Sequence, residues 1–389
     1  MIILTAIGLF SLYSVSQHQG GDFFHSAFSK QLIFVIPSII GFLLIFFIPR
    51  HIIHNYSYVL YVFAVIGVAI PYLGSHIAGT YRWINIGGIG FQPSEFAKWI
   101  LILALARYLS DHNIEMRRIT SVVIPFGIAL IPTAIVLKQP DLGSAVIMIV
   151  PVMTMLYWAG SRPFHLFILV APLLSVLTAF HTIPFTIWAF ILAIVIFFSR
   201  PRLLFGVSLF FTNIFLGLLW PVIWNSLRSY QQNRILTLFK PDLDPLGAAY
   251  QIIQSKTAIG SGGFIGKGWG MGTQTHLKFL PVQESDFILS VIGEELGFIS
   301  IMVIFLCFAY IILKILKMAY DSNDRYFSLV LVGVSTILLS HVFVNSAMTV
   351  GLIPVKGLPL PFISAGGSFL VSCYMMIGLI LNIGDTSRS

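Results

Sequence analysis

The stretch DFILSVIGEELGFISIMVIFLCFAYIILKIL, residues 286–316, decides the fold class of this chain. It is an apolar run that opens with an acid, Asp286, and it follows a polar, glycine-rich stretch at about 225–285. An apolar run of about 20 residues crosses the hydrocarbon core of a bilayer as a helix. We therefore interpret residues 286–316 as a membrane-spanning helix. Because the run is long for one span, we expect its start to lie at the surface or its axis to be tilted.

The composition extends this interpretation to the whole chain. Of the 389 residues, 57% are hydrophobic and only 9% are charged, whereas a soluble domain carries about a quarter charged residues. Backbone groups in lipid must be hydrogen-bonded internally, and these apolar runs lack the alternation of barrel strands. We predict an all-α polytopic membrane protein, a helical bundle in which residues 1–389 form one domain.

The apolar runs predict about 12 transmembrane helices. The seventh and eighth runs are the least clearly separated of the set. In chain order the runs are about 1–16, 31–48, 57–73, 94–109, 119–137, 143–160, 164–181, 184–198, 203–224, 286–316, 326–347 and 367–384.

Basic residues in the connectors predict the orientation. With the N-terminus inside, eleven of the 22 Lys and Arg residues lie in inner connectors. Five lie in outer connectors once the six within 225–285 are set aside. Positive charge is enriched in short cytoplasmic loops, so both termini are predicted to be cytoplasmic and 225–285 to be a large extracytoplasmic loop. The remaining outer cations indicate contact with an anionic substrate.

The net charge of +8 does not indicate nucleic acid, because the sequence has no basic tail and no basic run with interleaved aromatic residues. Cys307 and Cys373 lie inside apolar runs, where we expect packing residues and no disulfide. The first apolar run lacks the basic segment and cleavage site of a signal peptide, so we interpret it as a retained helix.

Two outer connectors bring charged residues to helix starts. The first contains Arg82 and then QPSEFAK at 92–98, in which Glu95 and Lys98 share a helix face. They form either an ion pair at the interface or part of a protein-lined cavity, and the cavity is favoured because charge facing lipid is costly. The second connector, QPDLGS at 139–144, offers Asp141 as a helix cap, as a substrate contact or as both.

The third motif is AIGSGGFIGKG at 258–268, which includes Lys267. It is not a Walker loop, because position 261 is Ser and Lys267 is followed by Gly268. Two interpretations stay open. The glycines and Lys267 form a backbone nest for a pyrophosphate, or they form a tight irregular turn.

Asp286 stands at the predicted start of a helix beside water. It is a candidate general base, or else a plain helix cap. The helix dipole lowers the pKa of such a carboxyl and burial raises it, so the sequence leaves its basicity open. Glu294 and Glu295 follow within the same run. We expect them to have structural roles, and either to face a cavity or to find cationic partners.

The last outer segment, GLIPVKGLPLPFISAGGS at 351–368, combines prolines and glycines and is predicted to be non-helical. Such backbone is tolerated at membrane depth only where protein or water surrounds it, so it is the expected floor of a cavity. The sequence contains no cluster of metal-ligating His and Cys and no nucleophile elbow. His341, inside a span, is interpreted as a packing or helix-bridging residue.

These outer segments together resemble the SEDS (shape, elongation, division, sporulation) family of peptidoglycan polymerases, and most closely its elongation branch. The resemblance covers about Gly8 to Gly384. It rests on elements in family order: QPSE, QPDLG, DPLGxxYQIIQSxxAIGSGG, SDFI, EELG and GLPLPFIS.

The resemblance implies a ten-helix core with an extra hairpin near 164–198, in the bacterial cytoplasmic membrane. It implies an inverting glycosyltransferase that polymerises lipid II into glycan strands, with undecaprenyl pyrophosphate as the leaving group. A class B penicillin-binding protein and other elongation-complex proteins are the implied partners. No definite cofactor is implied: Arg82, Lys98 and Lys267 would neutralise the leaving pyrophosphate either directly or together with a divalent cation, Mg²⁺ or Mn²⁺. Asp286 is the implied catalytic base, and the implied cavity residues are Arg82, Glu95, Lys98, Asp141 and Ser364.

The chain departs from the family pattern in two motifs. Residues 281–286 read PVQESD where the family reads Pro-Glu-x-His-Thr-Asp, so the aspartate is kept and the preceding glutamate and histidine are lost. Ala365 replaces a frequent tyrosine.

Two other functions fit a polytopic chain. A flippase or other transporter of lipid-linked precursors fits the architecture, but it predicts polar residues at mid-bilayer depth and on both faces. A scaffold without activity leaves the charged outer residues unexplained.

Overall fold

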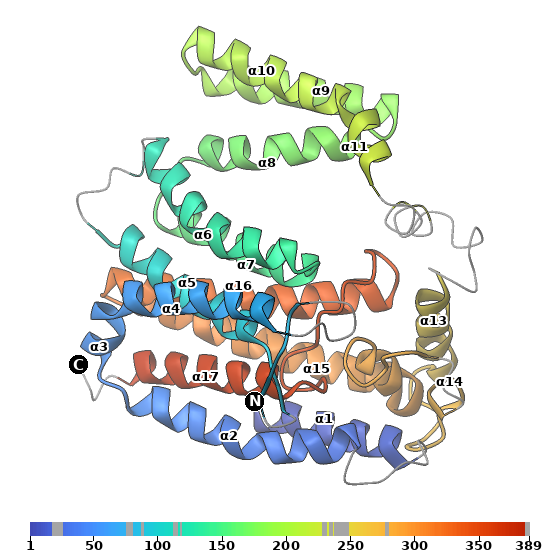
Figure 1. Ribbon diagram of the computed structural model, residues 1–389. Helices are drawn as coiled ribbons and strands as arrows, with labels where there is room; N and C mark the ends of the chain where they lie inside the picture. The colour runs from blue at the N-terminus through green and yellow to red at the C-terminus, as the bar shows by residue number, and fades with distance from the viewer. Residues whose placement is uncertain are drawn as a thin grey trace.

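The computed structural model describes residues 1–17, 26–74, 81–86, 89–111, 116, 119–227, 232, 236, 249–276 and 280–385. Helices dominate this part of the chain (Figure 1). The helices are α1 (Ile2–Gln17), α2 (Ala27–Phe47), α3 (Arg50–Asn55), α4 (Ser57–Ala69), η2 (Ile70–Leu73), α5 (Pro93–Leu109), α6 (Thr120–Lys138), α7 (Leu142–Trp158), α8 (Pro163–Thr178), α9 (Thr182–Ser199), α10 (Leu203–Leu218), α11 (Trp220–Ser226), α13 (Tyr250–Gly262), α14 (Thr273–His276), α15 (Ile288–Asp321), α16 (Arg325–Thr349) and α17 (Gly367–Gly384). The strands β1 (Ile84–Ile86) and β2 (Ile89–Phe91) form an antiparallel hairpin.

Each predicted apolar run contains a helix, which confirms the all-α polytopic fold. Within the described residues, 7 helical stretches are long and apolar enough to cross a membrane, and α1, α4, α7 and α8 are shorter apolar helices. α5 carries the remaining run together with its charged residues. The segment 225–285 is not loop throughout, because it contains α13 and α14.

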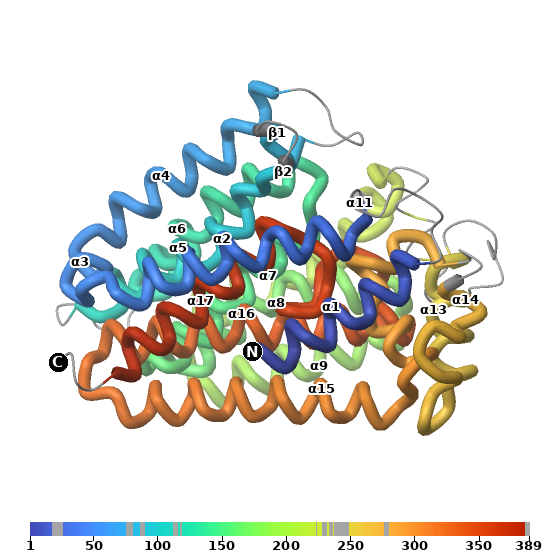
Figure 2. Tube along the Cα trace, turned by 90° about the horizontal axis from the view of Figure 1, so that it is seen from below, coloured from blue at the N-terminus to red at the C-terminus, as the bar shows by residue number. Residues whose placement is uncertain are grey.

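Burial separates the centre of the bundle from its lipid-facing periphery. The apolar stretches of α16 and α17 are 83% and 72% buried, whereas those of α2 and α9 are 17% and 11% buried. Apolar side chains that face outward from such helices are suited to hydrocarbon and not to water. Figure 2 shows most of the long helices running alongside one another, and Figure 1 shows α17 and α16 between α2 and the α8–α9 region.

Helices α8, α9 and α10 pack mainly on one another and join the rest of the bundle through α7 (Figure 1). They have a small core of their own around Trp188. Within it the Trp188 Nε1–H donates to Ser175 Oγ at 2.8 Å, and Ser175 Oγ–H donates to Asn213 Oδ1 at 3.0 Å. A hydrogen-bonded polar triad fixes the register of helices whose surfaces are otherwise mostly apolar.

The long run at 286–316 is accommodated by a break in α15, at Gly297. This residue has φ 77° and ψ −178°, a conformation that is essentially restricted to glycine. The break frees backbone groups on both sides, and the glycine-rich turn after α13 binds them. The N–H groups of Lys267 and Gly268 donate to the carbonyls of Glu294 and Glu295, and those of Phe298 and Ile299 donate to the carbonyls of Gly263 and Phe264.

These hydrogen bonds decide between the two interpretations of the glycine-rich motif. The backbone amides that a phosphate nest would need at Lys267 and Gly268 are already donated to protein carbonyls. A Cβ on Gly266 would lie 2.2 Å from the Glu295 carbonyl oxygen. The glycines are therefore there because two backbones touch, and the irregular-turn interpretation is the one that the structure supports.

Gly297→Ala is expected to destabilise the protein by about 2–5 kcal/mol, because alanine disfavours this conformation and overpacks the contact with Gly266. The added Cβ would lie 2.3 Å from the Gly266 nitrogen. Thermal unfolding in detergent micelles measures the effect. Gly127→Ala is the matched control, since a Cβ there meets nothing within 4 Å and alanine is the better helix former. Equal Tm values for the two variants would contradict this account of the break.

Candidate functional site

A polar cavity lies where the β-hairpin, the starts of α5 and α7 and the segments before α15 and α17 meet. Its volume is about 130 Å³, which suits a few water molecules or one reacting group of a larger substrate. Four of the seven predicted site residues line it. The lining residues are Arg82, Trp83, Gln92, Glu95, Asp141, Ser144, Ser285, Asp286, Gly357, Pro359, Ala365, Gly366 and Phe369.

Asp286 presents its carboxylate to this cavity from the turn before α15. Phe287, and not Asp286, is the N-cap residue of α15, so Asp286 does not act as a plain helix cap. The Asp286 carbonyl accepts a hydrogen bond from Asn345 Nδ2 at 3.0 Å, which fixes the backbone. Oδ1 accepts from Ser285 Oγ at 2.9 Å. A Cβ on Gly357 would stand 3.4 Å from Oδ2, so glycine there leaves this oxygen room.

Burial raises the pKa of Asp286 above its ordinary value, while the Ser285 hydrogen bond and the charge of Arg82 act in the opposite direction. Burial is the largest of these effects. A carboxylate with a raised pKa is a stronger base than an exposed aspartate.

Arg82 is held at the cavity by backbone carbonyls. Its Nε donates to the Gln139 carbonyl at 3.2 Å, and Nη2 donates to the Pro140 carbonyl. Nη1 lies 3.9 Å from the Asp141 carboxylate, and the Arg82 side chain is 25% exposed. The guanidinium is thus oriented by the protein and still reaches the cavity.

Asp141 both caps α7 and lines the cavity, as the two compatible interpretations of the sequence allowed. Its Oδ1 accepts from the Ser144 N–H at 3.1 Å. Its Oδ2 accepts from Gln92 Nε2 at 3.4 Å. The second bond ties the turn before α7 to the residue that precedes α5.

Glu95 and Lys98 form a buried ion pair and not an interfacial one. Lys98 Nζ lies 2.8 Å from both carboxylate oxygens of Glu95, and the two side chains are 2% and 5% exposed. Lys98 Nζ also lies 3.3 Å from His341 Nε2, and His341 Nδ1 lies 3.2 Å from the Pro359 carbonyl. Glu95 lines the cavity while Lys98 lies behind it, and His341 bridges helices as predicted.

Ser364 supports the cavity from behind, and its neighbours Ala365 and Gly366 form part of the wall. Its Oγ donates to the Ser285 carbonyl at 2.5 Å and accepts from the Leu360 N–H at 2.8 Å. Ser364 thereby fastens the proline-rich segment to the residue that precedes Asp286.

Lys267 lies outside this set of lining residues. Its Nζ donates to Glu294 Oε1 at 2.7 Å and to Thr273 Oγ1 at 2.7 Å. Glu294 also accepts from Thr273 Oγ1, from the Gln274 N–H and from the Thr275 N–H. Glu294 thus has a cationic partner, which is one of the two alternatives that the sequence left open.

Several lining residues had no role assigned from the sequence, although Gln92, Gly357 and Pro359 lie inside the motifs quoted above and Trp83 directly follows Arg82. Phe369 carried no sequence signal, because it is one apolar residue within an apolar helix. Among the described residues, no group of three or more His, Cys, Asp or Glu side chains is arranged to hold a metal ion.

An apolar groove of about 440 Å³ runs between α13, α15 and α16. Leu289, one turn after Asp286, lines it, together with Ile259, Phe298, Phe343 and Leu352. The groove therefore begins close to the turn that carries Asp286. Its lining suits an aliphatic chain.

Known proteins resemble the chain over its whole length. The family profile for FtsW, RodA and SpoVE, described as "Cell cycle protein", matches residues 1–188 and 184–389. The "Probable peptidoglycan glycosyltransferase FtsW" of Trichlorobacter lovleyi is 32% identical over 390 residues, covering 98% of this chain and 91% of that protein. The "Peptidoglycan glycosyltransferase MrdB" of Escherichia coli is 32% identical over 337 residues, covering 86% and 80%.

A solved structure has the same fold. It comes from work described as "Structural coordination of polymerization and crosslinking by a peptidoglycan synthase complex". The TM-score is 0.73 at 25% sequence identity, and the match covers 98% of this chain and 94% of the other.

Lys98→Met is expected to lower the free energy of unfolding by about 3–5 kcal/mol, because it leaves the Glu95 carboxylate buried without its cation. Denaturant unfolding in micelles measures the change. The double variant Glu95→Gln with Lys98→Met removes both charges and should recover much of the loss. If the double variant is as unstable as the single one, the pair is not coupled in the way described.

Proposed function

Because the chain belongs to the SEDS family of FtsW, RodA and SpoVE proteins, we propose that it is a peptidoglycan glycosyltransferase that polymerises lipid II at the outer face of the bacterial cytoplasmic membrane. The chain is a multi-span membrane protein. In this proposal both termini lie in the cytoplasm, and the Asp286 cavity opens on the other side.

One observation carries the assignment of the base. Three carboxylates line the cavity, and two of them are engaged: Glu95 by Lys98, and Asp141 by the α7 N-terminus and Gln92. Among the described residues, a single hydrogen bond, from Ser285, reaches the carboxylate of Asp286. Asp286 therefore keeps the acceptor capacity and the raised pKa that a general base needs.

In the proposed reaction, the 4-hydroxyl oxygen of the acceptor sugar attacks the anomeric carbon of the donor. Asp286 accepts the hydroxyl proton as the new carbon–oxygen bond forms. The bond between the anomeric carbon and the pyrophosphate oxygen breaks, and undecaprenyl pyrophosphate leaves with the electron pair. Attack from the face opposite the leaving group inverts the configuration.

Arg82 is the residue that we assign to the leaving pyrophosphate, because its guanidinium is oriented at the cavity edge. Lys98 and Ser364 act as positioning residues behind the wall, and Lys267 holds Glu294. Mg²⁺ usually binds substrate phosphates together with one or two carboxylates. In this proposal a divalent cation would bind the pyrophosphate of the substrate, and no residue of the chain is assigned to it as a ligand.

The lipid tail explains why such an enzyme lies in the membrane. The apolar groove along α15 begins near Asp286 and would receive a polyprenyl chain from the side. Within the family, we propose a place in the elongation branch with RodA and a class B penicillin-binding protein as partner. The similarity to a subunit of a peptidoglycan synthase complex supports a transpeptidase partner.

Asp286→Asn is expected to lower polymerisation of lipid II by purified protein about 10²–10⁴-fold, because the amide cannot accept the proton. Binding of lipid II should persist, since the side chain keeps its size. Gel analysis of labelled glycan chains measures the product, with the penicillin-binding protein present and absent.

Asp321→Asn, an exposed aspartate at the far end of α15, is the matched control and should polymerise normally. If Asp286→Asn made as much glycan as the wild-type protein, Asp286 would not be the general base. Translocation of lipid II in liposomes by a protein that makes no glycan would favour the flippase instead.

The pH profile gives a second test. Activity should be full above the pKa of Asp286 and fall as the pH drops through it, because the protonated carboxyl is no base. Arg82 lowers this pKa, so Arg82→Gln should move the acid limb to higher pH. Lys256→Gln removes an exposed charge on α13 and should leave the limb in place. An acid limb that Arg82→Gln does not move would mean that another group titrates.

A further inference from the structure

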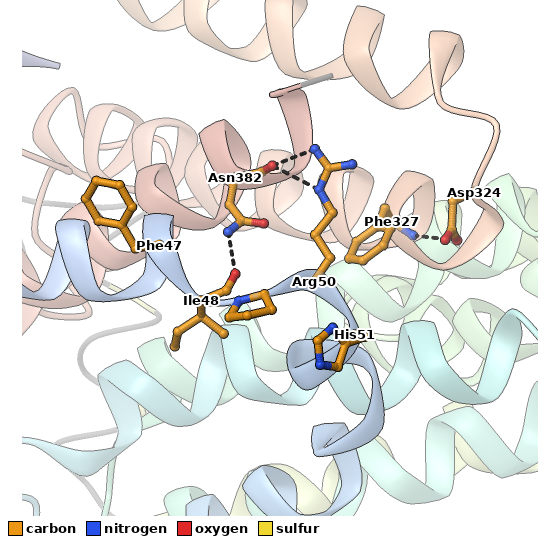
Figure 3. Close-up of a pocket in the computed structure, with 8 residues that line it drawn as sticks. Phe47, Ile48, Arg50, His51, Asp324, Phe327 and Asn382 are labelled. Carbon is orange, nitrogen blue, oxygen red and sulfur yellow. Dashed lines mark hydrogen bonds between the residues drawn. The ribbon is translucent and has the colours of Figure 1, made fainter. Parts of the chain in front are cut away.

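A second polar pocket lies between the corner that joins α2 to α3, the start of α16 and the end of α17 (Figure 3). Its volume is about 610 Å³. Polar and apolar residues share its wall. The lining residues are Phe47, Ile48, Pro49, Arg50, His51, Asp324, Phe327 and Asn382.

This pocket lies at the opposite end of the bundle from the Asp286 cavity. The start of α2 lies at the cavity end, because the Gln31 side chain is hydrogen-bonded to Ser364 and Gly366. The 21 residues of α2 lead from there to Arg50, a distance of about 30 Å. The pocket is therefore at the other membrane surface, level with lipid headgroups.

The cationic side of the pocket is Arg50, whose guanidinium is held by the end of α17. Nε and Nη2 donate to the Asn382 carbonyl at 3.2 and 2.9 Å, and Nη2 also donates to the Asp385 carbonyl. Among the described residues, no hydrogen bond engages Nη1. Figure 3 shows that free nitrogen on the side of Phe327 and Asp324, and His51 lies below it.

The opposite side of the pocket offers acceptors. Asp324 caps α16 with Oδ1, which accepts from the N–H groups of Tyr326 and Phe327. Its Oδ2 carries no hydrogen bond from the described residues. Asn382 is 1% exposed, and its Nδ2 donates to three carbonyls. Its Oδ1 is buried without a hydrogen-bond partner among the described residues, and it lies on the side of the amide that faces Arg50.

We propose that this pocket binds the phosphoethanolamine headgroup of a phospholipid. Arg50 Nη1 and His51 would donate to the phosphate, and the ammonium would donate to Asp324 Oδ2. A headgroup with both charges matches the two sides of the pocket, whereas an anionic glycerol headgroup would meet the Asp324 charge. A choline headgroup carries no N–H to donate to the carboxylate.

The surface next to the pocket favours a membrane lipid over a soluble phosphoethanolamine. Phe47 and Ile48 form part of the wall. The α2 face that leads away from it exposes Leu43, Leu44 and Phe47 by 43%, 62% and 63%. In a spanning helix this face meets hydrocarbon, so acyl chains would lie along it while the headgroup enters the pocket.

The test compares phosphatidylethanolamine, phosphatidylcholine and phosphatidylglycerol with identical acyl chains. Each lipid is titrated into the full-length protein in detergent, and native mass spectrometry measures the Kd of the lipid molecule that binds first. Phosphatidylethanolamine should bind about tenfold tighter than either other lipid, the scale of one charge-assisted hydrogen bond. Glycerophosphoethanolamine, which lacks the tails, should not compete at equal concentration.

Two variants test the two sides. Asp324→Asn keeps a good N-cap residue for α16 and should reduce the affinity for phosphatidylethanolamine to that for phosphatidylcholine. Arg50→Gln should weaken the binding of both phosphatidylethanolamine and phosphatidylcholine about tenfold. Lys317→Gln removes an exposed charge near the end of α15 and is the control. It should leave the ratio of the affinities for phosphatidylethanolamine and phosphatidylcholine unchanged. Thermal unfolding of each variant confirms that it is folded.

Three results would overturn the proposal. The first is wild-type protein that does not prefer phosphatidylethanolamine to phosphatidylcholine, or that prefers phosphatidylglycerol. The second is a preference that survives in Asp324→Asn. The third is equal competition by glycerophosphoethanolamine, which would make the site one for a soluble ligand.

Discussion

A polar group in hydrocarbon has to find its partner inside the protein, and this constraint organises the end of the bundle that carries the cavity. Lys98 engages both oxygens of Glu95, and four donors surround the Glu294 carboxylate. Asp141 Oδ1 accepts the capping hydrogen bond at the start of α7. Asp286 lies among these acids with fewer partners, so its remaining acceptor capacity is available to a substrate. The carboxylates whose oxygens are fully hydrogen-bonded within the protein hold the structure together. The one with acceptor capacity left, Asp286, is suited to chemistry.

The same constraint accounts for the glycine-rich sequence before α15. A break in a membrane helix exposes backbone groups that water cannot reach, and the turn after α13 satisfies them. Backbone reaches backbone only where no Cβ intervenes, which explains glycine at 262, 266 and 297. The break ends the short first part of α15, which Asp286 precedes, so the position of the carboxylate depends on those contacts.

Helices α2 and α17 join the two polar ends of the molecule. At the cavity end Gln31 is hydrogen-bonded to the segment that enters α17. At the other end Asn382 of α17 donates to carbonyls at the end of α2, and Arg50 at the start of α3 donates to the Asn382 carbonyl. The middle of the bundle is apolar core around α5, α16 and α17. Polar sites at two ends and packed apolar residues between them fit an enzyme with one reaction face better than a transporter with a central pathway.

Much of the fold and part of the site could be predicted from the sequence. Hydropathy located the helices because a spanning helix must be apolar for about 20 residues. The motif residues Arg82, Glu95, Asp141 and Asp286 were predicted to share a site, and they line one cavity. Each of them stands at a helix start or in a connector, where polar residues in an apolar sequence are conspicuous.

Which way a side chain turns was decided only by tertiary structure. Lipid-facing and core-facing sides of these helices are both apolar, so sequence periodicity cannot tell them apart. The sequence therefore grouped Lys98 and Lys267 with the substrate cations, while packing buries the first against Glu95 and engages the second with Glu294. The break at Gly297 and the packing of α8–α10 likewise depend on contacts between segments far apart in the chain. The sequence by itself determined which segments cross the membrane, and the packing of those segments decided which charges remain free to act.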